Sequence, residues 1–138
     1  MRIIVMGCGR SGAYLARHLD QEGHDVTVID RNSDSFARLG SDFRGTMVLG
    51  TGIDEDVLRR AGIENADAFV AVSNGDNTNA MAAEIAKLVF KVPRVVARLY
   101  DPVRENTYHA LGLMETVCTT VMASDKIHDL ILGNGKSK

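Results

Sequence analysis

The chain has 138 residues, a formal net charge of −2 and a charged fraction of 25%. That length fits one domain with a single core, and the near-neutral charge excludes a strong attraction to nucleic acid or anionic lipid. No apolar run approaches the roughly 20 residues of a membrane-spanning helix, and no signal peptide is recognisable. We therefore expect a cytoplasmic protein with no nucleic-acid partner and no direct membrane insertion.

The two cysteines, Cys8 and Cys118, lie far apart and match neither a C-x-x-C motif nor a metal-ligand spacing. This usage is typical of a reducing compartment, and we expect no metal site. Cys8 falls inside a glycine-rich stretch, where it is either a redox-sensitive thiol or a small side chain that fits its surroundings.

The N-terminal residues predict a strand, a glycine-rich turn and a helix in immediate succession. Residues 2–6 are typical of a buried strand, and from residue 11 the apolar residues recur at helical spacing. A helix that begins directly after such a turn points free N–H groups and its positive dipole end at an anion. The glycines allow a tight turn, close approach of a pyrophosphate and close helix–strand packing. The phosphate cradle predicted here consists of Gly7, Cys8, Gly9, Arg10, Ser11 and Gly12.

A second predicted strand, residues 26–29, ends at Asp30. In a dinucleotide-binding unit, a carboxylate at this place accepts hydrogen bonds from the adenosine ribose and repels a 2′-phosphate, which favours NAD or an adenine nucleotide over NADP. The alternative is a turn carboxylate that caps the helix following Asn32 or Ser33. Arg31 could stack on adenine or accommodate a further phosphate.

The third predicted strand, residues 46–49, leads into Thr51 and Gly52. Because this turn lies at the carboxyl end of a strand near the first one, we interpret it as the floor beneath an adenine ring; an ordinary turn is the alternative. Asp54 then caps a predicted helix that ends at Gly62.

Two further strands are predicted at residues 68–72 and 94–99. The first opens into small polar residues that begin with Ser73 and Asn74, which either contact a ribose or phosphate or form a solvated loop with a helix cap. The second carries Arg98 within an apolar run, where a charge needs a partner. Arg98 binds either a nucleotide phosphate, in its own or a neighbouring subunit, or a carboxylate such as that of Asp76.

The helix predicted over residues 78–90 has one thin polar stripe, formed by Glu84, Lys87 and Lys91, and is otherwise apolar. A helix on the outside of a sheet needs only one buried face. The additional apolar side chains therefore predict that a second protein surface packs against this helix, most simply another copy of the chain. A last helical segment after Thr120 carries an apolar stripe that is suited to docking.

A sixth strand is predicted at residues 114–118. The regular alternation of six strands with helices predicts an α/β fold, a Rossmann-like doubly wound parallel sheet in the order 3-2-1-4-5-6 with a C-terminal docking helix. Residues 1–132 form the nucleotide-binding domain, and residues 133–138 are expected to be a flexible tail or the start of a linker. The singled-out residues then share the carboxyl edge of the sheet around one crevice.

Three functions are compatible with this crevice: a nucleotide-sensing regulatory module, a small NAD-dependent oxidoreductase, and a scaffold with a vestigial nucleotide site. A hydride-transfer enzyme usually needs an acid or base that faces the nicotinamide. None of the four histidines is predicted at a crevice strand end, so we expect nucleotide binding without enzymatic turnover.

The chain resembles the regulator-of-conductance-for-potassium (RCK) N-terminal domains, also called KTN or TrkA-N domains, over residues 1 to about 132. The resemblance rests on the motifs at residues 5–12, 23–26, 28–30, 54–63, 66–74 and 95–98, and on Asp76, Thr78 and Asn79. Many members carry a Pro-Glu pair after the sixth strand, and its carboxylate serves a cation beside the nucleotide in some of them; this chain has Thr120 and Val121 there.

The resemblance implies a regulatory subunit that binds NAD(H), with ATP or ADP as the alternative, and gates a membrane potassium transporter of the Trk or Ktr type from the inner face of the cell membrane. It implies homodimers that assemble into a larger ring, with the last helix crossing to the partner. It also implies residue roles: pyrophosphate binding by residues 7–11, ribose binding by Asp30, adenosine contacts by Thr51 and Gly52, crevice contacts by Ser73 and Asn74, and phosphate binding by Arg98.

Overall fold

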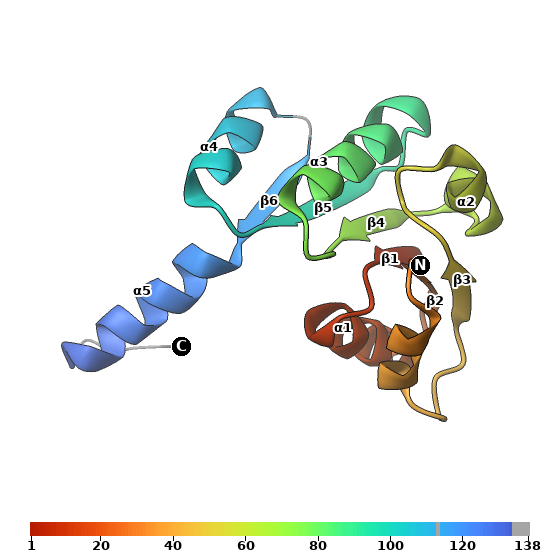
Figure 1. Ribbon diagram of the computed structural model, residues 1–138, viewed down its shortest axis with the longest axis horizontal. Helices are drawn as coiled ribbons and strands as arrows, with labels where there is room; N and C mark the ends of the chain where they lie inside the picture. Colours follow the sequence, from red (N-terminus) through yellow and green to blue (C-terminus); the bar gives the residue numbers. More distant parts are fainter. Residues whose placement is uncertain (113, 134–138) are drawn as a thin grey trace.

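The computed structural model describes residues 1–112 and 114–133 (Figure 1). All strands of its six-stranded sheet pair in parallel, in the order β3-β2-β1-β4-β5-β6, which confirms the predicted architecture. The strands are β1 (Arg2–Met6), β2 (Asp25–Asp30), β3 (Thr46–Leu49), β4 (Ala68–Ala71), β5 (Arg94–Leu99) and β6 (Glu115–Cys118).

Helices and single helical turns connect the strands, and three of them begin at a side-chain cap. Asn32, Asp54 and Asp101 each accept a hydrogen bond from a backbone N–H two residues further on. The helical elements are α1 (Arg10–Gln21), η1 (Ser33–Leu39), α2 (Glu55–Arg60), η2 (Ile63–Asn65), α3 (Asp76–Glu84), η3 (Ile85–Val89), α4 (Pro102–Leu111) and α5 (Thr119–Ile131).

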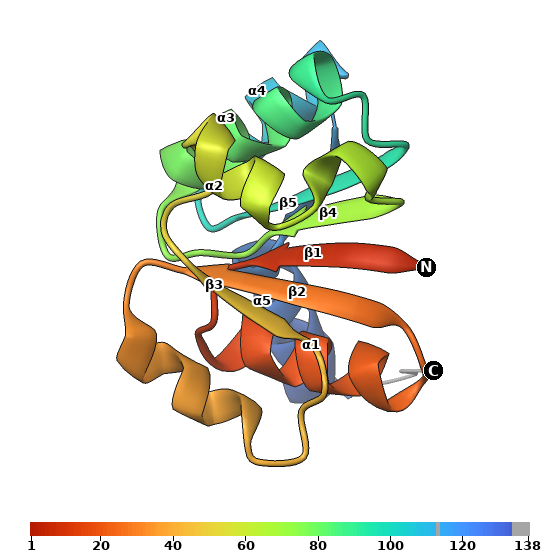
Figure 2. The same ribbon diagram turned by 90° about the vertical axis from the view of Figure 1, so that its right-hand side faces the viewer.

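The core has two layers, one on each face of the sheet. Side chains of β1 alternate between them: Ile4 packs with α2 and α3 on one face, whereas Ile3 and Val5 pack with α1 and η1 on the other. Figure 2 shows α2, α3 and α4 on one side of the sheet and α1 on the opposite side. The carboxyl edge of the strands is therefore left open between two helical layers.

The inner face of α1 includes a charged residue, Asp20, beside the buried Gly12, Ala13 and Ala16. Asp20 is buried and accepts a hydrogen bond from the Arg44 N–H at 3.1 Å, while the Arg44 guanidinium donates to the Asp20 carbonyl oxygen. Its contact lies in the segment between η1 and β3, so helical periodicity alone could not reveal it. Leu15 and Leu19 are only half-buried.

The third helix begins at Asp76 and ends in the π-helical turn η3. The small residues of this helix are buried within the chain itself, so less of its apolar surface is exposed than the sequence analysis predicted. Three large apolar side chains of α3 and η3 remain exposed, those of Met81, Leu88 and Val89.

Helix α5 projects away from the sheet beyond β6 (Figure 1). Residues 120–131 are all exposed, and the apolar side chains among them include Met122, Ile127, Leu130 and Ile131. Within the described ranges, no helix is both long and apolar enough to cross a lipid bilayer. Of the predicted flexible tail, residues 134–138 lie outside the described residues.

Candidate functional site

A crevice of about 650 Å³ opens at the carboxyl ends of β1 to β4, beside the glycine loop. The predicted site residues that line it are Gly7, Gly9, Asp30, Arg31, Thr51, Gly52, Ser73 and Asn74. The other predicted residues, Cys8, Arg10, Ser11, Gly12 and Arg98, are not among its lining. The structure thus brings together loops that are up to about seventy positions apart in the sequence, at the place where doubly wound folds bind ligands.

The three glycines of the loop are needed for different structural reasons. A Cβ on Gly7 would lie 2.7 Å from the Ser73 nitrogen, and Gly7 has φ of 114°, which side-chain-bearing residues rarely adopt. A Cβ on Gly12 would lie 1.8 Å from the Gly7 carbonyl oxygen. A Cβ on Gly9 would meet no atom within 4 Å. Gly7 and Gly12 therefore permit close packing, whereas Gly9 keeps the floor of the crevice open.

Backbone N–H groups without a helical acceptor lie at the start of α1, directly after the crevice-lining Gly9. The first helical hydrogen bond of α1 runs from the Ala13 N–H to the Gly9 carbonyl, so the N–H groups of Arg10, Ser11 and Gly12 have no helical acceptor. Within the described residues, no side chain caps this helix, and its first turn holds no acidic residue. These donors, together with the helix dipole, favour an anion at this point.

Asp30 holds the loop in place with both carboxylate oxygens. Oδ2 accepts a hydrogen bond from the Cys8 N–H at 2.7 Å, and Oδ1 accepts one from the Asn32 N–H at 2.8 Å. The helix cap of η1 is supplied by Asn32, whose Oδ1 accepts from the Asp34 N–H, so the capping alternative for Asp30 is wrong. Asp30 is half-buried and lines the crevice, and its carboxylate has further lone pairs available.

Cys8 is enclosed by the segment that follows β2. Its Sγ donates to the Ser35 carbonyl oxygen at 3.3 Å, and the Arg38 guanidinium donates to the Cys8 carbonyl oxygen at 3.3 Å. Burial, and secondarily the Asp30 carboxylate, raises the pKa of the Cys8 thiol to about 11, against a smaller lowering by Arg38. A buried, protonated thiol is unreactive, which favours the interpretation of Cys8 as a small side chain that fits its surroundings.

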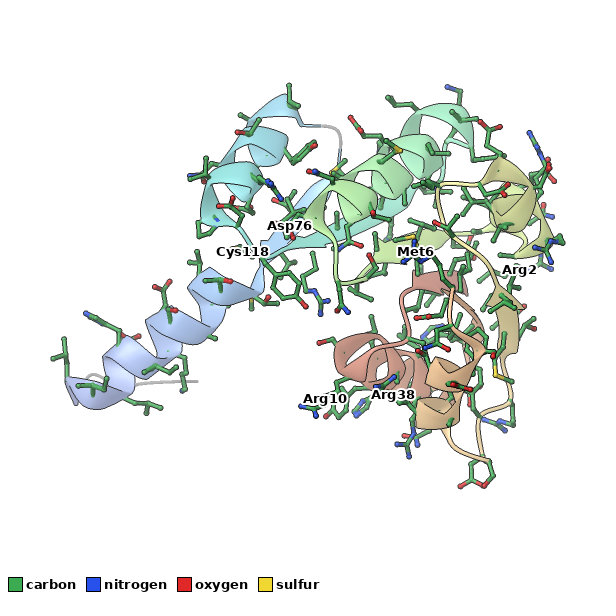
Figure 3. All side chains as sticks on the ribbon, in the orientation of Figure 1. Arg2, Met6, Arg10, Arg38, Asp76 and Cys118 are labelled. Atoms are coloured by element: carbon green, nitrogen blue, oxygen red, sulfur yellow. The ribbon has the colours of Figure 1, made fainter. Side chains whose placement is uncertain are left out.

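The turn after β3 forms a third wall of the crevice, beside the glycine loop and the segment after β2. The Gly50 N–H donates to the Asp30 carbonyl oxygen at 2.9 Å, which ties this turn to the end of β2. A Cβ on Gly52 would lie 2.0 Å from the sulfur of Met6, a side chain that also lines the crevice (Figure 3). Thr51 lines the crevice beside this close contact. The turn after β3 and the end of β1 therefore pack directly against each other at the base of the crevice.

The fourth wall, after β4, is held by the buried side chain of Asn79. Asn79 Oδ1 accepts from the Ser73 N–H at 2.9 Å and from the Ser73 hydroxyl at 2.6 Å. Its Nδ2 donates to the carbonyl oxygens of Ser73 at 3.0 Å and Arg98 at 2.8 Å. All hydrogen-bonding capacity of this carboxamide is used, so it locks the end of β4 to that of β5.

Arg98 does not pair with Asp76, which corrects one of the two alternatives for its partner. Its guanidinium donates to the carbonyl oxygens of Val72 at 2.9 Å and Ser73 at 3.0 Å, and lies 4.7 Å from the ring centroid of Tyr100. Within the described residues, the buried Arg98 Nε has no hydrogen-bond partner. Phosphate binding by Arg98 stays a prediction.

The Asp76 carboxylate instead accepts hydrogen bonds from the N–H groups of Tyr100 at 2.8 Å and Asp101 at 2.9 Å. Cys118 approaches the same segment, since its Sγ lies 3.6 Å from the Tyr100 carbonyl oxygen. Figure 3 shows Asp76 and Cys118 beside each other at this junction. The buried polar side chains between β4 and β5, those of Asp76, Asn79 and Arg98, therefore have structural roles. Ser73, to which Asn79 and Arg98 are bonded, lines the crevice.

The sequence prediction missed several lining residues, notably Asn32, Ser35 and Arg38. Ser35 and Arg38 belong to η1, and Asn32 is its N-cap. Arg38 of this element reaches back to the glycine loop, and no local sequence pattern predicts that contact. Over the described ranges, histidine, cysteine and acidic side chains form no cluster of three or more that could hold a metal ion.

The fold and the crevice define a doubly wound α/β domain of the kind that binds nucleotides. Comparison with known families shows which protein family the chain belongs to. Residues 3–119 match the family model of the TrkA-N domain. The chain belongs to the TrkA-N domain family, as its motifs indicated.

Among curated proteins, the chain is 51% identical over 135 residues to the Trk system potassium uptake protein TrkA of Streptomyces coelicolor, covering 98% of this chain and 60% of that protein. It is 32% identical over 127 residues to the TrkA homolog of Pyrococcus abyssi, covering 92% of this chain and 56% of that protein. The chain thus spans somewhat more than half the length of these relatives.

Solved structures share the fold at lower identity. The Shewanella denitrificans Kef C-terminal domain in its AMP-bound form superposes with a TM-score of 0.82 at 21% identity, covering 100% of this chain and 84% of that one. The GsuK channel bound to NAD gives a TM-score of 0.81 at 23% identity, covering 96% of this chain and 23% of the channel.

Proposed function

We propose that this chain is the nucleotide-binding part of a regulatory subunit that gates a Trk-type or Ktr-type potassium transporter. The observation that carries the proposal is the crevice at the glycine loop, which Gly7, Gly9 and Asp30 line and in which the Asp30 carboxylate holds the Cys8 N–H of that loop. Support comes from the 51% identity to a potassium uptake protein and from two proteins of the same fold that are bound to NAD and to AMP.

The proposed ligand is NAD(H), with ATP or ADP as the alternative. Gly9 and the N–H groups of residues 10–12 would hold the pyrophosphate, because a Cβ-free floor and unpaired donors suit a close anion. Asp30 would accept from ribose hydroxyls, and Arg31, Thr51 and Gly52 would contact the adenosine. Asn74 would contact the ligand on the β4 side, and Cys8 would support the loop from below. Arg98, which holds the Ser73 carbonyl oxygen at the edge of the crevice, would supply positive charge for a phosphate.

We propose binding without turnover. Among the described residues that line the crevice, Asp30 is the one carboxylate and no histidine occurs. Because both Asp30 oxygens already accept backbone N–H bonds, this carboxylate is suited to hold a sugar rather than to move a proton.

Calorimetry with NADH, NAD, ATP and ADP tests the nucleotide site. Asp30→Ala is expected to weaken binding about tenfold or more, since hydrogen bonds to a charged group are lost and the Cys8 N–H loses its acceptor. Asp34→Ala is the matched control, because it removes an exposed carboxylate from the same segment that does not line the crevice. Equal binding by wild type and Asp30→Ala would contradict the ribose role, and no binding at all would favour a vestigial site.

The regulatory role requires that the nucleotide stabilise one arrangement of subunits over another. We propose a homodimer, assembled into a larger ring at the cytoplasmic face of the membrane, with α5 crossing to a partner. Its exposed apolar side chains, for example Ile131 at 75% exposure, supply the contact surface. Potassium flux into vesicles that contain a Trk-type transporter, measured with and without the chain and NADH, tests the gating; flux that never responds would contradict it.

A further inference from the structure

We infer that Asn74, in the loop after β4, is a site of spontaneous deamidation, and that its conversion to an aspartyl or isoaspartyl residue weakens the binding of an anionic ligand in the crevice. The modification itself depends on the residues of this loop alone. Its effect on a ligand rests on the proposed nucleotide site. The two parts are therefore tested by separate measurements.

The residue after Asn74 is glycine, the neighbour that favours deamidation most. In this reaction the main-chain nitrogen of the following residue has to reach the side-chain Cγ of the asparagine, and a glycine without Cβ allows that approach most easily. Among residues 1–112 and 114–133, no other asparagine precedes a glycine. Asn65 and Asn79, for comparison, precede alanine. Asn74 is therefore the most susceptible asparagine of this part of the chain.

The side chain of Asn74 is accessible and unrestrained. Asn74 is exposed and lines the crevice. The side-chain hydrogen bonds of its loop join Ser73 to Gly75 and Asn79, and within the described residues none involves the Asn74 carboxamide. Asn79 is the opposite case, because it is fully buried and both ends of its carboxamide are bonded. Only the Asn74 side chain can therefore turn toward its neighbour without losing a hydrogen bond.

The main-chain nitrogen of Gly75 is held weakly. Its N–H approaches the Ser73 hydroxyl oxygen at 3.5 Å, which is long for a hydrogen bond. Residues 72–75 belong to neither a strand nor a helix, since α3 begins at Asp76. The movement that brings the Gly75 nitrogen to Cγ of Asn74 consequently breaks no bond of the sheet ladder and none of the helix.

Water is the one co-reactant that the chemistry needs. The Gly75 nitrogen gives up its proton and bonds to Cγ of Asn74, while the Cγ–Nδ2 bond breaks and Nδ2 leaves with a proton as ammonia. The product is a five-membered succinimide ring. Attack of water at Cγ reopens it to an aspartyl residue with the normal main chain. Attack at the main-chain carbonyl carbon gives an isoaspartyl residue, whose main chain runs through Cγ.

Either product changes the crevice in the same direction. It adds a negative charge to a lining in which Asp30 is the one carboxylate among the described residues, and this charge repels an anion at the glycine loop. The isoaspartyl product also lengthens the main chain by one carbon atom. Because Asn79 holds both the N–H and the carbonyl oxygen of Ser73, the extra atom has to be accommodated between Ser73 and α3, at the edge of the crevice.

Peptide mass spectrometry during incubation at mildly alkaline pH tests the modification. The tryptic peptide of residues 61–87 contains Asn65, Asn74, Asn77 and Asn79, so fragmentation compares all four in one sample. Asn74 should convert first, at a rate similar to that in a synthetic peptide of residues 71–79. Asn74 that stays intact in the folded chain while the synthetic peptide converts overturns the inference.

Gly75→Ala is the matched variant for the attacking nitrogen. The added Cβ would lie 3.4 Å from Thr78 Oγ1, an ordinary contact, and φ of −107° with ψ of 122° suits alanine. Conversion at position 74 should slow about fivefold or more, because alanine restricts the main chain that has to approach Cγ. An unchanged rate contradicts the proposed attack. If this variant does not fold, the comparison with the synthetic peptide decides.

Calorimetry with NADH on fresh and converted wild-type protein tests the effect on the crevice. Conversion should weaken binding about threefold or more, as expected for a partly screened like-charge contact. Asn74→Asp should reproduce the loss, whereas Asn77→Asp, which adds the same charge at an exposed residue outside the crevice lining, should not. Unchanged NADH affinity after conversion overturns this second part. Fresh wild-type protein that does not bind NADH overturns the proposed function, and the rate at Asn74 still decides the first part.

Discussion

Two glycines three positions apart in the same loop should respond to alanine in opposite ways. Gly12→Ala places a Cβ 1.8 Å from the Gly7 carbonyl oxygen and 3.2 Å from Val72 Cγ2. The first distance is about 1.5 Å shorter than an ordinary carbon–oxygen contact, and the atom that has to give way is backbone. Gly9→Ala places its Cβ in open space, at φ of −77° and ψ of −164°, which alanine adopts freely.

The expected magnitudes follow from these contacts. Gly12→Ala forces α1 away from β1, and such overpacking costs about 1–3 kcal/mol of unfolding free energy or more. Gly9→Ala should change stability by less than about 0.5 kcal/mol, as a substitution that touches nothing. Its new methyl group, however, occupies the surface that a pyrophosphate must approach, so NADH binding should fall at least about tenfold.

Urea denaturation and calorimetry with NADH, carried out on both variants, separate the two effects. Gly12→Ala should lose stability, and Gly9→Ala should lose binding at wild-type stability. Wild-type NADH affinity of a folded Gly9→Ala variant would refute the placement of the phosphates at this loop. Wild-type stability of Gly12→Ala would refute the argument from close packing.

Asp76→Ala should lower the unfolding free energy by about 2–4 kcal/mol, because the Tyr100 and Asp101 N–H groups lose their buried acceptor; Asp76→Asn, which keeps one acceptor oxygen, should lose less in the same urea titration. Alkylation of Cys8 by iodoacetamide at pH 8, followed by peptide mass spectrometry, should be about 100-fold slower than that of a thiol with the ordinary pKa of 9.0, since the pKa of Cys8 is raised to about 11. The raised pKa also means that the contribution of Cys8 to stability is complete below pH 9.0 and is lost as the pH rises through about 11, a loss that Cys8→Ala should lack. Leu130→Glu should shift the chain from dimer to monomer in sedimentation velocity, while Lys126→Glu, a charge change on the same helix, should not; a wild-type monomer at micromolar concentration would contradict the α5 interface.

The sheet was predictable because its determinants are local. Uninterrupted apolar runs such as residues 3–6, and turns such as the one at Gly7, alternate along the chain with helical periodicity, and parallel crossovers leave few topologies open. The family motifs could likewise be read directly. Most of the predicted crevice residues therefore lie together, since parallel strands bring their carboxyl ends to one edge.

The pairing of buried polar groups was decided by the tertiary structure. Asp76 and Arg98 are opposite charges, and their pairing was a reasonable hypothesis, yet each satisfies backbone groups instead. Asp20 is buried by a contact that depends on the position of Arg44. Such choices depend on which backbone donors and acceptors remain unpaired after the strands have assembled, and a linear pattern does not contain that information.

A doubly wound α/β domain with a phosphate-type loop and a following carboxylate can be predicted from the amino-acid sequence, because hydrophobic period and glycine placement are local properties. Three contacts became evident only in the assembled fold: that of Asp30 with the Cys8 N–H, that of η1 with the glycine loop, and that of Asn79 with the Ser73 hydroxyl. The physical reason is that hydrogen-bond polarity depends on the positions of neighbours that are far away in sequence, and these neighbours meet only when the sheet is complete.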